Sequence, residues 1–135
     1  MEGRHMSRRS TQTLTEVELE FMLILWQHGE ATSEIIQDDF RSRGRELSGG
    51  AIRRMLAILT DKGFVGRRKE GRSFTYFPAV SERNAKSGMV GDLLRRAFGG
   101  SAAHMIAALF NSRDISGDDL KKIDAIIATR RKEKQ

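Results

Sequence analysis

Cysteine is absent from this 135-residue sequence, so neither a disulfide framework nor a thiolate-bound metal is available to the chain. Apolar runs are also short, and none approaches the roughly 18 residues of a membrane-spanning helix. The N-terminus lacks the apolar core of a secretory signal peptide. These absences lead us to expect a cytoplasmic protein that uses no cofactor and contacts no membrane.

Catalytic motifs are equally scarce in this chain. Apart from His5, its histidines are His28 and His104, and no H-E-x-x-H, G-x-S-x-G or phosphate-loop pattern occurs. An active site needs a nucleophile, a base and an orienting group within reach of one another, and the sequence offers no such set. We therefore do not expect an enzyme.

Residues 1–13 stand apart from the patterned sequence that follows them. The stretch MEGRH at positions 1–5 resembles the remnant of an expression tag with its protease site, and Met6 resembles a native start. The polar stretch 7–13 is expected to be flexible. We therefore begin the folded part of the chain at residue 14.

Two helices are expected in the first part of the folded region. The first runs to Gly29 and opens with a T-x-x-E capping box at Thr15 and Glu18, and its Trp26 is expected to anchor the core. The second has Thr32 as its N-cap. The residues expected on its inward face are Ile35, Ile36 and Phe40.

A third helix is expected between Ser48, which can cap its first turn, and Gly63, which supplies a glycine stop. Apolar residues recur at i, i+3, i+4 and i+7, a spacing that makes one buried stripe of Ile52, Met55, Leu56 and Leu59. Small residues on the opposite face allow close approach to DNA, and two adjacent arginines there can reach guanine edges or phosphates. That face consists of Gly50, Arg53, Arg54, Ala57 and Asp61.

A β-hairpin is expected directly after this helix. Residues 65–69 and 73–77 form two short segments, of which the second is rich in aromatic and β-branched side chains. Glu70 and Gly71 are expected to make the turn, with Gly71 at a positive φ, and Pro78 ends the second strand. Four basic residues cluster around the turn, namely Arg67, Arg68, Lys69 and Arg72.

Side chains of the second segment alternate between the two faces of the hairpin. Phe74 and Tyr76 share one face, and Thr75 and Phe77 share the other. One of these pairs is expected to pack onto the helices, and the sequence leaves open which one.

Positive charge concentrates in this part of the chain. The window 41–77 holds ten Lys and Arg against three Asp and Glu, whereas the whole chain has a net charge of only +6. A basic window on a nearly balanced remainder is typical of a phosphate-binding surface. Residues 14–79 therefore predict a winged helix-turn-helix domain that binds double-stranded DNA. The residues expected to contact DNA are Thr32, Ser33, Ser48, Gly50, Ala51, Arg53, Arg54, Arg67, Arg68, Lys69 and Arg72.

Residues 80–135 are expected to form three further helices, which makes the fold mostly α with a small β-hairpin wing. Gly99 and Gly100 end the first of these helices, and Ser116 caps the last. Three short helices in about 50 residues can hardly bury their apolar stripes alone, so a second copy of the chain is the simplest partner. We therefore expect a dimerisation domain. Its interface candidates are Leu93, Met105, Ile106, Leu109, Phe110, Ile123 and Ile127.

The chain resembles the penicillinase repressors of the BlaI/MecI type across nearly all of residues 14–132. The matching segments are LTEVELEFMLILW, S-x-x-A-I-R-R-M-L-A-I-L-x-x-K-G, RRKEGRSFTYFP and SGDDLKKI. The resemblance implies a homodimeric bacterial repressor. Its N-terminal winged helix would bind a palindromic operator, and its small C-terminal helical domain would dimerise.

The resemblance has departures that bear on regulation. Family members usually carry threonine where Ala51 and Arg54 stand, so the operator sequence does not carry over. In antibiotic-sensing members a receptor-protease signal leads to cleavage at an Asn-Phe bond, which aligns with Ala108–Leu109 here. A regulatory protease is therefore an open question for this chain. The cysteine cluster of copper-responsive relatives is absent, which excludes a cysteine-based metal signal.

An alternative function is a winged helix that binds a protein partner and no specific operator. That alternative predicts a neutral or apolar outward face on the third helix, whereas Arg53, Arg54 and the basic hairpin give a charged one. RNA binding is less favoured, because no exposed aromatic pair is clearly placed for base stacking. The sequence therefore favours a DNA-binding repressor over these two functions.

Overall fold

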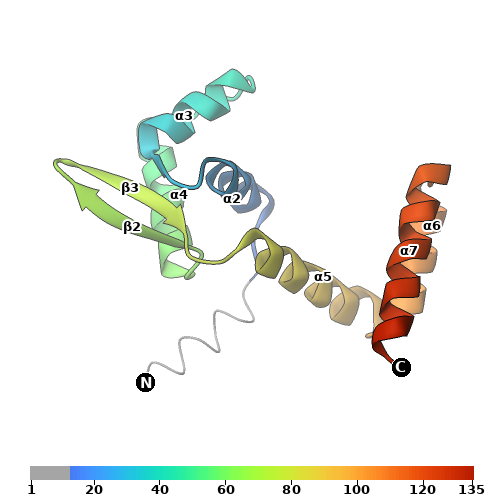
Figure 1. Cartoon of the computed structure of the whole chain (residues 1–135). Coiled ribbons are helices and arrows are strands. Elements are labelled where there is room, and N and C mark those ends of the chain that lie inside the picture. Colours follow the sequence, from blue (N-terminus) through green and yellow to red (C-terminus); the bar gives the residue numbers. More distant parts are fainter. Residues whose placement is uncertain (1–12) are drawn as a thin grey trace. The chain divides into compact units, whose positions relative to one another are not determined.

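The computed structural model describes residues 13–135, and the expected tag remnant lies outside the described residues, as does most of the stretch 7–13 that was expected to be flexible. The chain divides into two compact units between Asp92 and Leu93 (Figure 1). In chain order the elements are α2 (Glu16–His28), β1 (Ala31–Thr32), α3 (Ser33–Ser42), α4 (Gly49–Asp61), β2 (Val65–Glu70), β3 (Ser73–Pro78), α5 (Glu82–Phe98), α6 (Ala102–Ser112) and α7 (Gly117–Glu133). The expected fold class, mostly helical with a small β-hairpin wing, is confirmed.

The helix starts follow from local sequence. Thr15 and Glu18 form the expected capping box, with the Glu18 amide donating to Thr15 Oγ1 at 3.2 Å and the Thr15 amide donating to Glu18 Oε1 at 2.8 Å. Thr32 and Ser48 cap α3 and α4 by accepting from the amides three residues on. Ser116 caps α7 in the same way. Each cap satisfies an amide that has no partner within its helix.

The core of the first unit lies between α2, α3, α4 and the sheet. The Phe21 and Phe40 rings meet at 4.9 Å between centroids, and Trp26 is partly buried, with its Nε1 donating to the Val80 carbonyl at 2.9 Å. Burying this apolar surface is the main contribution to the stability of the unit. The fully buried side chains are Phe21, Met22, Ile24, Leu25, Ile36, Phe40, Ile52, Leu56 and Leu59.

One inward-facing residue of α3 was predicted wrongly. Ile36 and Phe40 are buried, but Ile35 is 42 % exposed. Residues 36 and 40 are four apart and share one face of the helix, whereas residue 35 is rotated by about 100° from that face. The stripe on α3 is therefore narrower than the run of apolar residues suggests.

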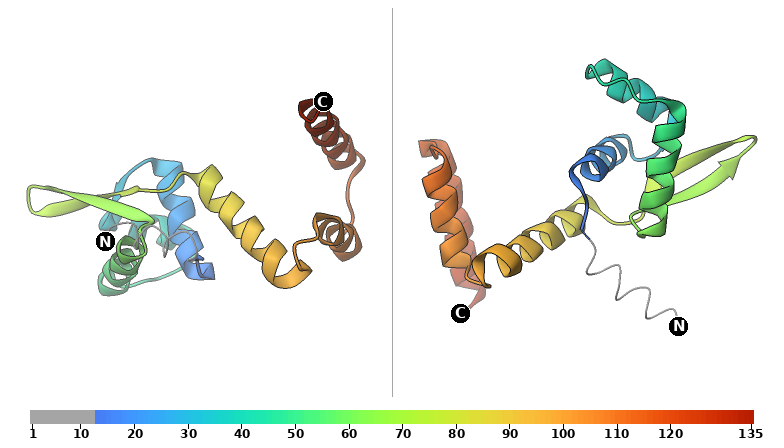
Figure 2. Two further views of the ribbon diagram at one scale, coloured as in Figure 1. Left: turned by 90° about the horizontal axis from the view of Figure 1, so that it is seen from below. Right: turned by 180° about the vertical axis from the view of Figure 1, so that it is seen from behind.

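The sheet has three antiparallel strands in the order β1-β3-β2. The hairpin of β2 and β3 is the expected wing, and it extends beyond the helices in all three views (Figures 1 and 2). Its turn is made by Gly71 and Arg72, not by Glu70 and Gly71, because Glu70 pairs with Ser73. A two-residue turn with a positive φ only at its first position suits glycine there, and Gly71 has φ 65°.

The third strand, β1, was not predicted from the sequence. Its two residues pair with the middle of β3, Ala31 with Tyr76 and Thr32 with Thr75. This pairing covers β3 on both edges and ties the base of the wing to the start of α3. Tyr76 joins the core of the unit and Phe74 packs partly against it, which identifies the face of β3 that the sequence left open.

A close contact in the wing gives a first testable prediction. A Cβ added at Gly66 would lie 2.5 Å from Cε1 of the Phe77 ring. Replacing Gly66 with alanine is therefore expected to lower the free energy of unfolding by about 1–3 kcal/mol, as measured by urea denaturation. Gly88 is the control, because a Cβ there meets nothing within 4 Å and alanine favours the α5 helix. Equal midpoints for Gly66→Ala and the unmodified chain would contradict this packing.

The second unit differs sharply from the first, because it has no buried core of its own. No residue from Leu93 to Gln135 is buried. Gly99 and Gly100 separate α5 from α6, as expected, and both have a positive φ. Within residues 13–135, no helix is both long and apolar enough to cross a membrane. Large apolar residues of this unit that are exposed include Leu93, Ile106, Leu109, Phe110, Leu120, Ile126 and Ile127.

Candidate nucleic-acid interface

The outward face of α4 is open and basic. Ile52, Leu56 and Leu59 bury the inward face of this helix, and the residues opposite them are exposed. The first turn carries no acidic side chain and begins with Gly49 and Gly50, so its amides are uncovered apart from the Ser48 cap. A helix N-terminus of this kind favours negative charge. The exposed residues on this face are Gly50, Ala51, Arg53, Arg54, Ala57 and Asp61.

The wing divides its basic residues between two faces. In the antiparallel register Arg67 lies opposite Tyr76 and Lys69 lies opposite Phe74, so these four side chains share the face that looks toward α4. The Arg67 guanidinium carbon lies 4.1 Å from the centroid of the Phe74 ring. Such stacking holds the planar guanidinium in place while leaving its N–H groups free to donate.

Arg68 points to the other face of the wing and is fully engaged within the chain. Its guanidinium donates to Glu30, just before β1, and, at 2.8 Å, to Glu70 Oε2. Thr75 Oγ1 donates to the second oxygen of Glu70 at 3.0 Å. The hydrogen bond that Arg68 donates to Glu30, followed by the one it donates to Glu70, raises the pKa of Arg68, and the hydrogen bonds from Arg68 and Thr75 lower the pKa of Glu70. This network fixes the wing to the turn between α2 and β1.

Other cations of the basic window are also neutralised. Each one lies within 3.3 Å of a carboxylate oxygen. Most of these carboxylates come from α2 and α3, outside the window itself, and this is why the sequence did not show them. The pairs are Arg41 with Asp38 and Glu46, Arg43 with Asp39, Arg45 with Glu20, and Lys62 with Glu18.

Five cations of the window have no carboxylate partner among the described residues, and we call them the basic surface. They come from the exposed face of α4 and from the wing. Half of the Lys and Arg side chains in the window 41–77 are therefore available to bind an external anion. The basic surface consists of Arg53, Arg54, Arg67, Lys69 and Arg72.

The remaining predicted contact residues lie nearby but have local partners. Thr32 and Ser33 are half-buried at the start of α3, and the Thr32 hydroxyl accepts from the Ile35 amide. Ser48 is exposed and caps α4. Within residues 13–135 there is no group of three or more His, Asp or Glu that could hold a metal ion.

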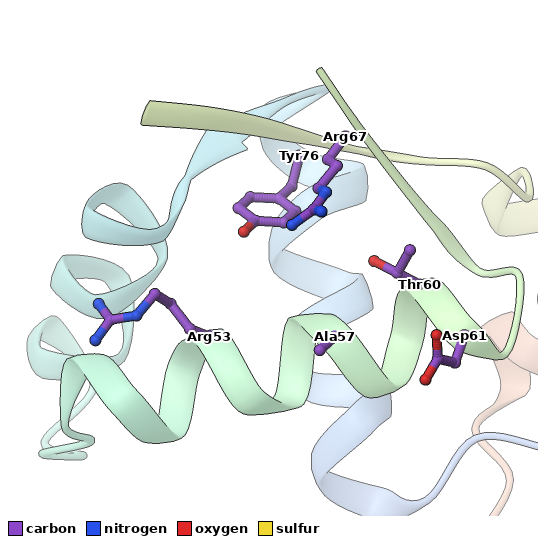
Figure 3. Close-up of a pocket in the computed structure, with 6 residues that line it drawn as sticks. All are labelled: Arg53, Ala57, Thr60, Asp61, Arg67 and Tyr76. Atoms are coloured by element: carbon purple, nitrogen blue, oxygen red, sulfur yellow. The ribbon is translucent and has the colours of Figure 1, made fainter. Parts of the chain in front are cut away.

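A pocket of about 140 Å³ opens between α4 and the wing (Figure 3). Arg67 and Tyr76 project into it from the hairpin, toward the helix. The sequence did not identify Tyr76 as a site residue, since an aromatic residue in a strand is usually part of the core. The lining residues are Arg53, Ala57, Thr60, Asp61, Arg67 and Tyr76.

The ion pair between Lys62 and Glu18 joins the C-terminal end of α4 to the first turn of α2. Lys62 Nζ donates to Glu18 Oε1 at 2.8 Å and to the Thr13 carbonyl at 3.2 Å. Burial raises the pKa of Glu18, but hydrogen bonds from Lys62 and from the Thr15 backbone outweigh burial and hold this pKa below its usual 4.5. A lowered pKa in the folded state stabilises the fold above pH 4.5, and this contribution is lost as the pH falls through the lowered value.

Removing Lys62 gives the second prediction. Lys62→Met is expected to lower the free energy of unfolding at pH 7 by about 1–3 kcal/mol, because it leaves the buried Glu18 carboxylate without its cation. The penalty should shrink as the pH falls and Glu18 takes up a proton. Lys69→Met, at an exposed position without an ion pair, is the control and should change stability by less than about 0.5 kcal/mol. Denaturation at several pH values measures both, and a penalty that does not vary with pH would contradict the account.

A comparison with known sequences places this chain among repressors. The sequence model of the penicillinase repressor family matches residues 14–129. The penicillinase repressor of Bacillus licheniformis is 27 % identical over 123 residues, which cover 90 % of this chain and 94 % of that protein. The methicillin resistance regulatory protein MecI of Staphylococcus aureus strain Mu50 is 24 % identical over 117 residues, covering 87 % and 94 %.

Two solved structures are also similar to this chain. The DNA-binding domain of the repressor BlaI is 32 % identical, covers 51 % of this chain and 83 % of its own, and has a TM-score of 0.46. A solved complex of the protein RosR, hsRosR-SG, covers 90 % of this chain and 95 % of its own, with 16 % identity and a TM-score of 0.52. The RosR likeness extends over both units and concerns the fold alone.

Proposed function

Because this chain belongs to the penicillinase repressor family, we propose that it is a homodimeric transcriptional repressor that binds an inverted-repeat operator through α4 and the wing. The observation that carries the proposal is the basic surface. Its five cations lack carboxylate partners among the described residues, and they lie on the two elements of a winged helix that meet a duplex.

The two parts of the basic surface have different roles in this proposal. Arg53 and Arg54, on an exposed helix face with small neighbours, fit the major groove, where arginine reaches the O6 and N7 atoms of guanine. Lys69 and Arg72 lie near the tip of the wing and fit the phosphate backbone, which positions the protein without reading sequence. Specificity would therefore come mainly from α4, and salt-dependent affinity from both elements.

Dimerisation is supported by the second unit. A domain that buries no residue cannot obtain much stability from its own packing. Five of the seven predicted interface residues are exposed, whereas Met105 and Ile123 are half-buried. A second copy of the chain would cover these stripes with an equivalent surface, and its two-fold symmetry would be matched by an inverted repeat in the operator. The five exposed residues are Leu93, Ile106, Leu109, Phe110 and Ile127.

Proteolytic induction is not part of this proposal. The bond between Ala108 and Leu109 lies inside α6. A protease that needs an extended substrate would first have to unwind that helix. Asn and Phe, the residues that the resemblance places at the susceptible bond, do not stand at these two positions.

Selection from random duplex DNA tests the proposed function. The full chain is incubated with a pool of random duplexes, and bound sequences are enriched and sequenced. The expected result is an inverted repeat whose half-sites lie about one helical turn, or a multiple of it, apart. A pool that stays random after repeated enrichment would overturn the function, and a single unrepeated half-site would overturn the dimeric mode of binding.

Salt dependence separates Arg68 from its neighbours and gives a third prediction. Lys69→Gln and Arg72→Gln should each reduce the slope of log affinity against log salt by about 0.9, because each removes one phosphate contact. Arg68→Gln should leave the slope nearly unchanged, since Glu30 and Glu70 hold Arg68 on the opposite face. Fluorescence anisotropy with the selected duplex measures all three. A slope reduced as much by Arg68→Gln as by Lys69→Gln would mean that Arg68 also meets phosphate.

A further inference from the structure

The pocket between α4 and the wing is lined by Tyr76, whose hydroxyl has no hydrogen-bond partner among residues 13–135. Tyr76 is only 6 % exposed, and none of the described residues forms a hydrogen bond with its hydroxyl group. Buried hydroxyl groups are nearly always hydrogen-bonded, because leaving one without a partner is costly. In Figure 3 the Tyr76 hydroxyl points into the pocket, toward the end at which Arg53 lies.

The other polar groups of the pocket define the charge of a fitting ligand. Arg67 lies beside Tyr76 on the same face of the wing, and its guanidinium is held by the Phe74 ring and by no carboxylate among residues 13–135. Thr60 offers no donor, since its Oγ1 already donates to the Leu56 carbonyl at 2.8 Å. All available side-chain donors therefore come from two guanidinium groups and one phenol.

One carboxylate also lines this pocket. Asp61 lies about two helical turns from Arg53 along α4, at the opposite end of the pocket from the Tyr76 hydroxyl (Figure 3). Two guanidinium groups against one carboxylate leave a net positive pocket, and the hydroxyl lies at its more positive end. An oxyanion is the ligand that satisfies the Tyr76 hydroxyl and the Arg67 guanidinium together. The volume of about 140 Å³ suits a small anion and not a large organic molecule.

We propose that this pocket seats a phosphate group, and that the occupant is a phosphodiester of the operator backbone that accepts hydrogen bonds from the Tyr76 hydroxyl and from Arg67. The proposal rests on the proposed function and adds Tyr76 to it as a DNA contact. A neutral donor at this place gives affinity that does not depend on counterion release, unlike the contacts of Lys69 and Arg72. It would fix the distance between the wing and α4 on the DNA.

Tyr76→Phe in the full chain tests the proposed phosphate site, because this substitution removes only the phenolic hydroxyl group. The variant should unfold at the same temperature or higher, since the hydroxyl has no partner among the described residues. Its affinity for the selected duplex should fall about tenfold, with the slope of log affinity against log salt unchanged. Thr75→Val is the matched control, because it deletes a hydroxyl from the opposite face of β3. Thr75→Val should not reduce the penalty for neutralising a single phosphate of the duplex.

Duplexes with single methylphosphonate substitutions locate the phosphate. At one position in each half-site, neutralising the phosphate should weaken binding of the unmodified chain but should cost Tyr76→Phe less, because only the Arg67 contact to that phosphate remains in the variant. The Thr75→Val variant should retain the full penalty at that position. Equal affinity of Tyr76→Phe and the unmodified chain would overturn the proposed phosphate site while leaving the repressor function intact. Equal methylphosphonate penalties for these two proteins at every position would do the same. Failure of the unmodified chain to bind any duplex would overturn both.

The source of the phosphate is distinguished by a fluorine label. Tyr76 is the only tyrosine in the chain, so 3-fluorotyrosine incorporation gives a single ¹⁹F resonance that reports on the pocket. The resonance should shift on addition of the selected duplex and should not respond to inorganic phosphate at low millimolar concentration. A response to inorganic phosphate but not to duplex would overturn the assignment to the operator backbone and would identify a site for a free anion.

Discussion

Replacing Leu109 with lysine is expected to convert the protein from a dimer to a monomer and to weaken operator binding by about 10²–10⁴-fold. Leu109 is 46 % exposed in the single chain, so lysine is tolerated there before association. In the proposed dimer the same position is covered, and an unpaired ammonium would be buried without a partner. The loss in affinity follows because the second half-site is no longer bound in an effectively intramolecular step.

Sedimentation at micromolar protein concentration measures the first of these effects, and anisotropy with the selected duplex measures the second. Asn111→Lys is the matched control, since it places the same charge at an exposed polar position two residues further along α6. The control should remain dimeric and bind normally. If Leu109→Lys remained a dimer, the apolar surface of α6 would not be the interface. If the unmodified chain sedimented as a monomer, there would be no reason to expect an inverted repeat.

The second large effect concerns the recognition face of α4. Arg53→Ala and Arg54→Ala are each expected to cost about 1–3 kcal/mol of operator binding if the arginine is bidentate to a guanine, which is roughly a 5-fold to 150-fold loss in affinity. Each variant should also change which base is preferred at one position of the half-site, as a phosphate contact would not. Stability should change little, because both side chains are exposed.

Competition binding with single-base variants of the selected duplex measures both effects. Arg41→Ala is the matched control, because Asp38 and Glu46 already pair with its guanidinium. That variant should bind all duplexes as the unmodified chain does. Unchanged affinity in both the Arg53 and the Arg54 variant would show that α4 does not contact the operator.

Much of the fold could be predicted because its signals are local. The capping box of Thr15 and Glu18 and the cap at Ser48 each involve residues three apart, so the sequence alone contains both partners. The apolar stripe of α4 was predicted from helical spacing in the same way. The hairpin followed from strand-forming residues on both sides of Gly71, although the turn itself lies one residue later than expected.

The features that were missed depend on residues far apart in the chain. The strand β1 has only two residues and exists because it pairs with β3, more than forty residues later. The neutralisation of Arg45 and Arg68 depends on Glu20 and Glu30, which lie 25 and 38 residues away from them. Counting charges along the sequence therefore overestimated the number of cations in the basic surface. Only the folded chain shows which of them have no carboxylate partner among the described residues.

Tyr76 illustrates a different limit of sequence reasoning. Its place in an aromatic strand predicts a core residue, and its ring does lie in the core. Its hydroxyl nevertheless opens into a pocket shared with α4, a relation that alternation along β3 cannot reveal. A residue can therefore stabilise the fold with its ring and serve a ligand with its polar end.

Backbone amide chemical shifts of the full chain, recorded during titration with the selected duplex, test most directly where DNA binds. We predict that the largest changes fall on residues 49–57 of α4 and on residues 66–72 of the wing. The exposed face of α3 around Ile35 should change least among the helices of the first unit. Shifts that left α4 and the wing unchanged and appeared around Ile35 would contradict the account.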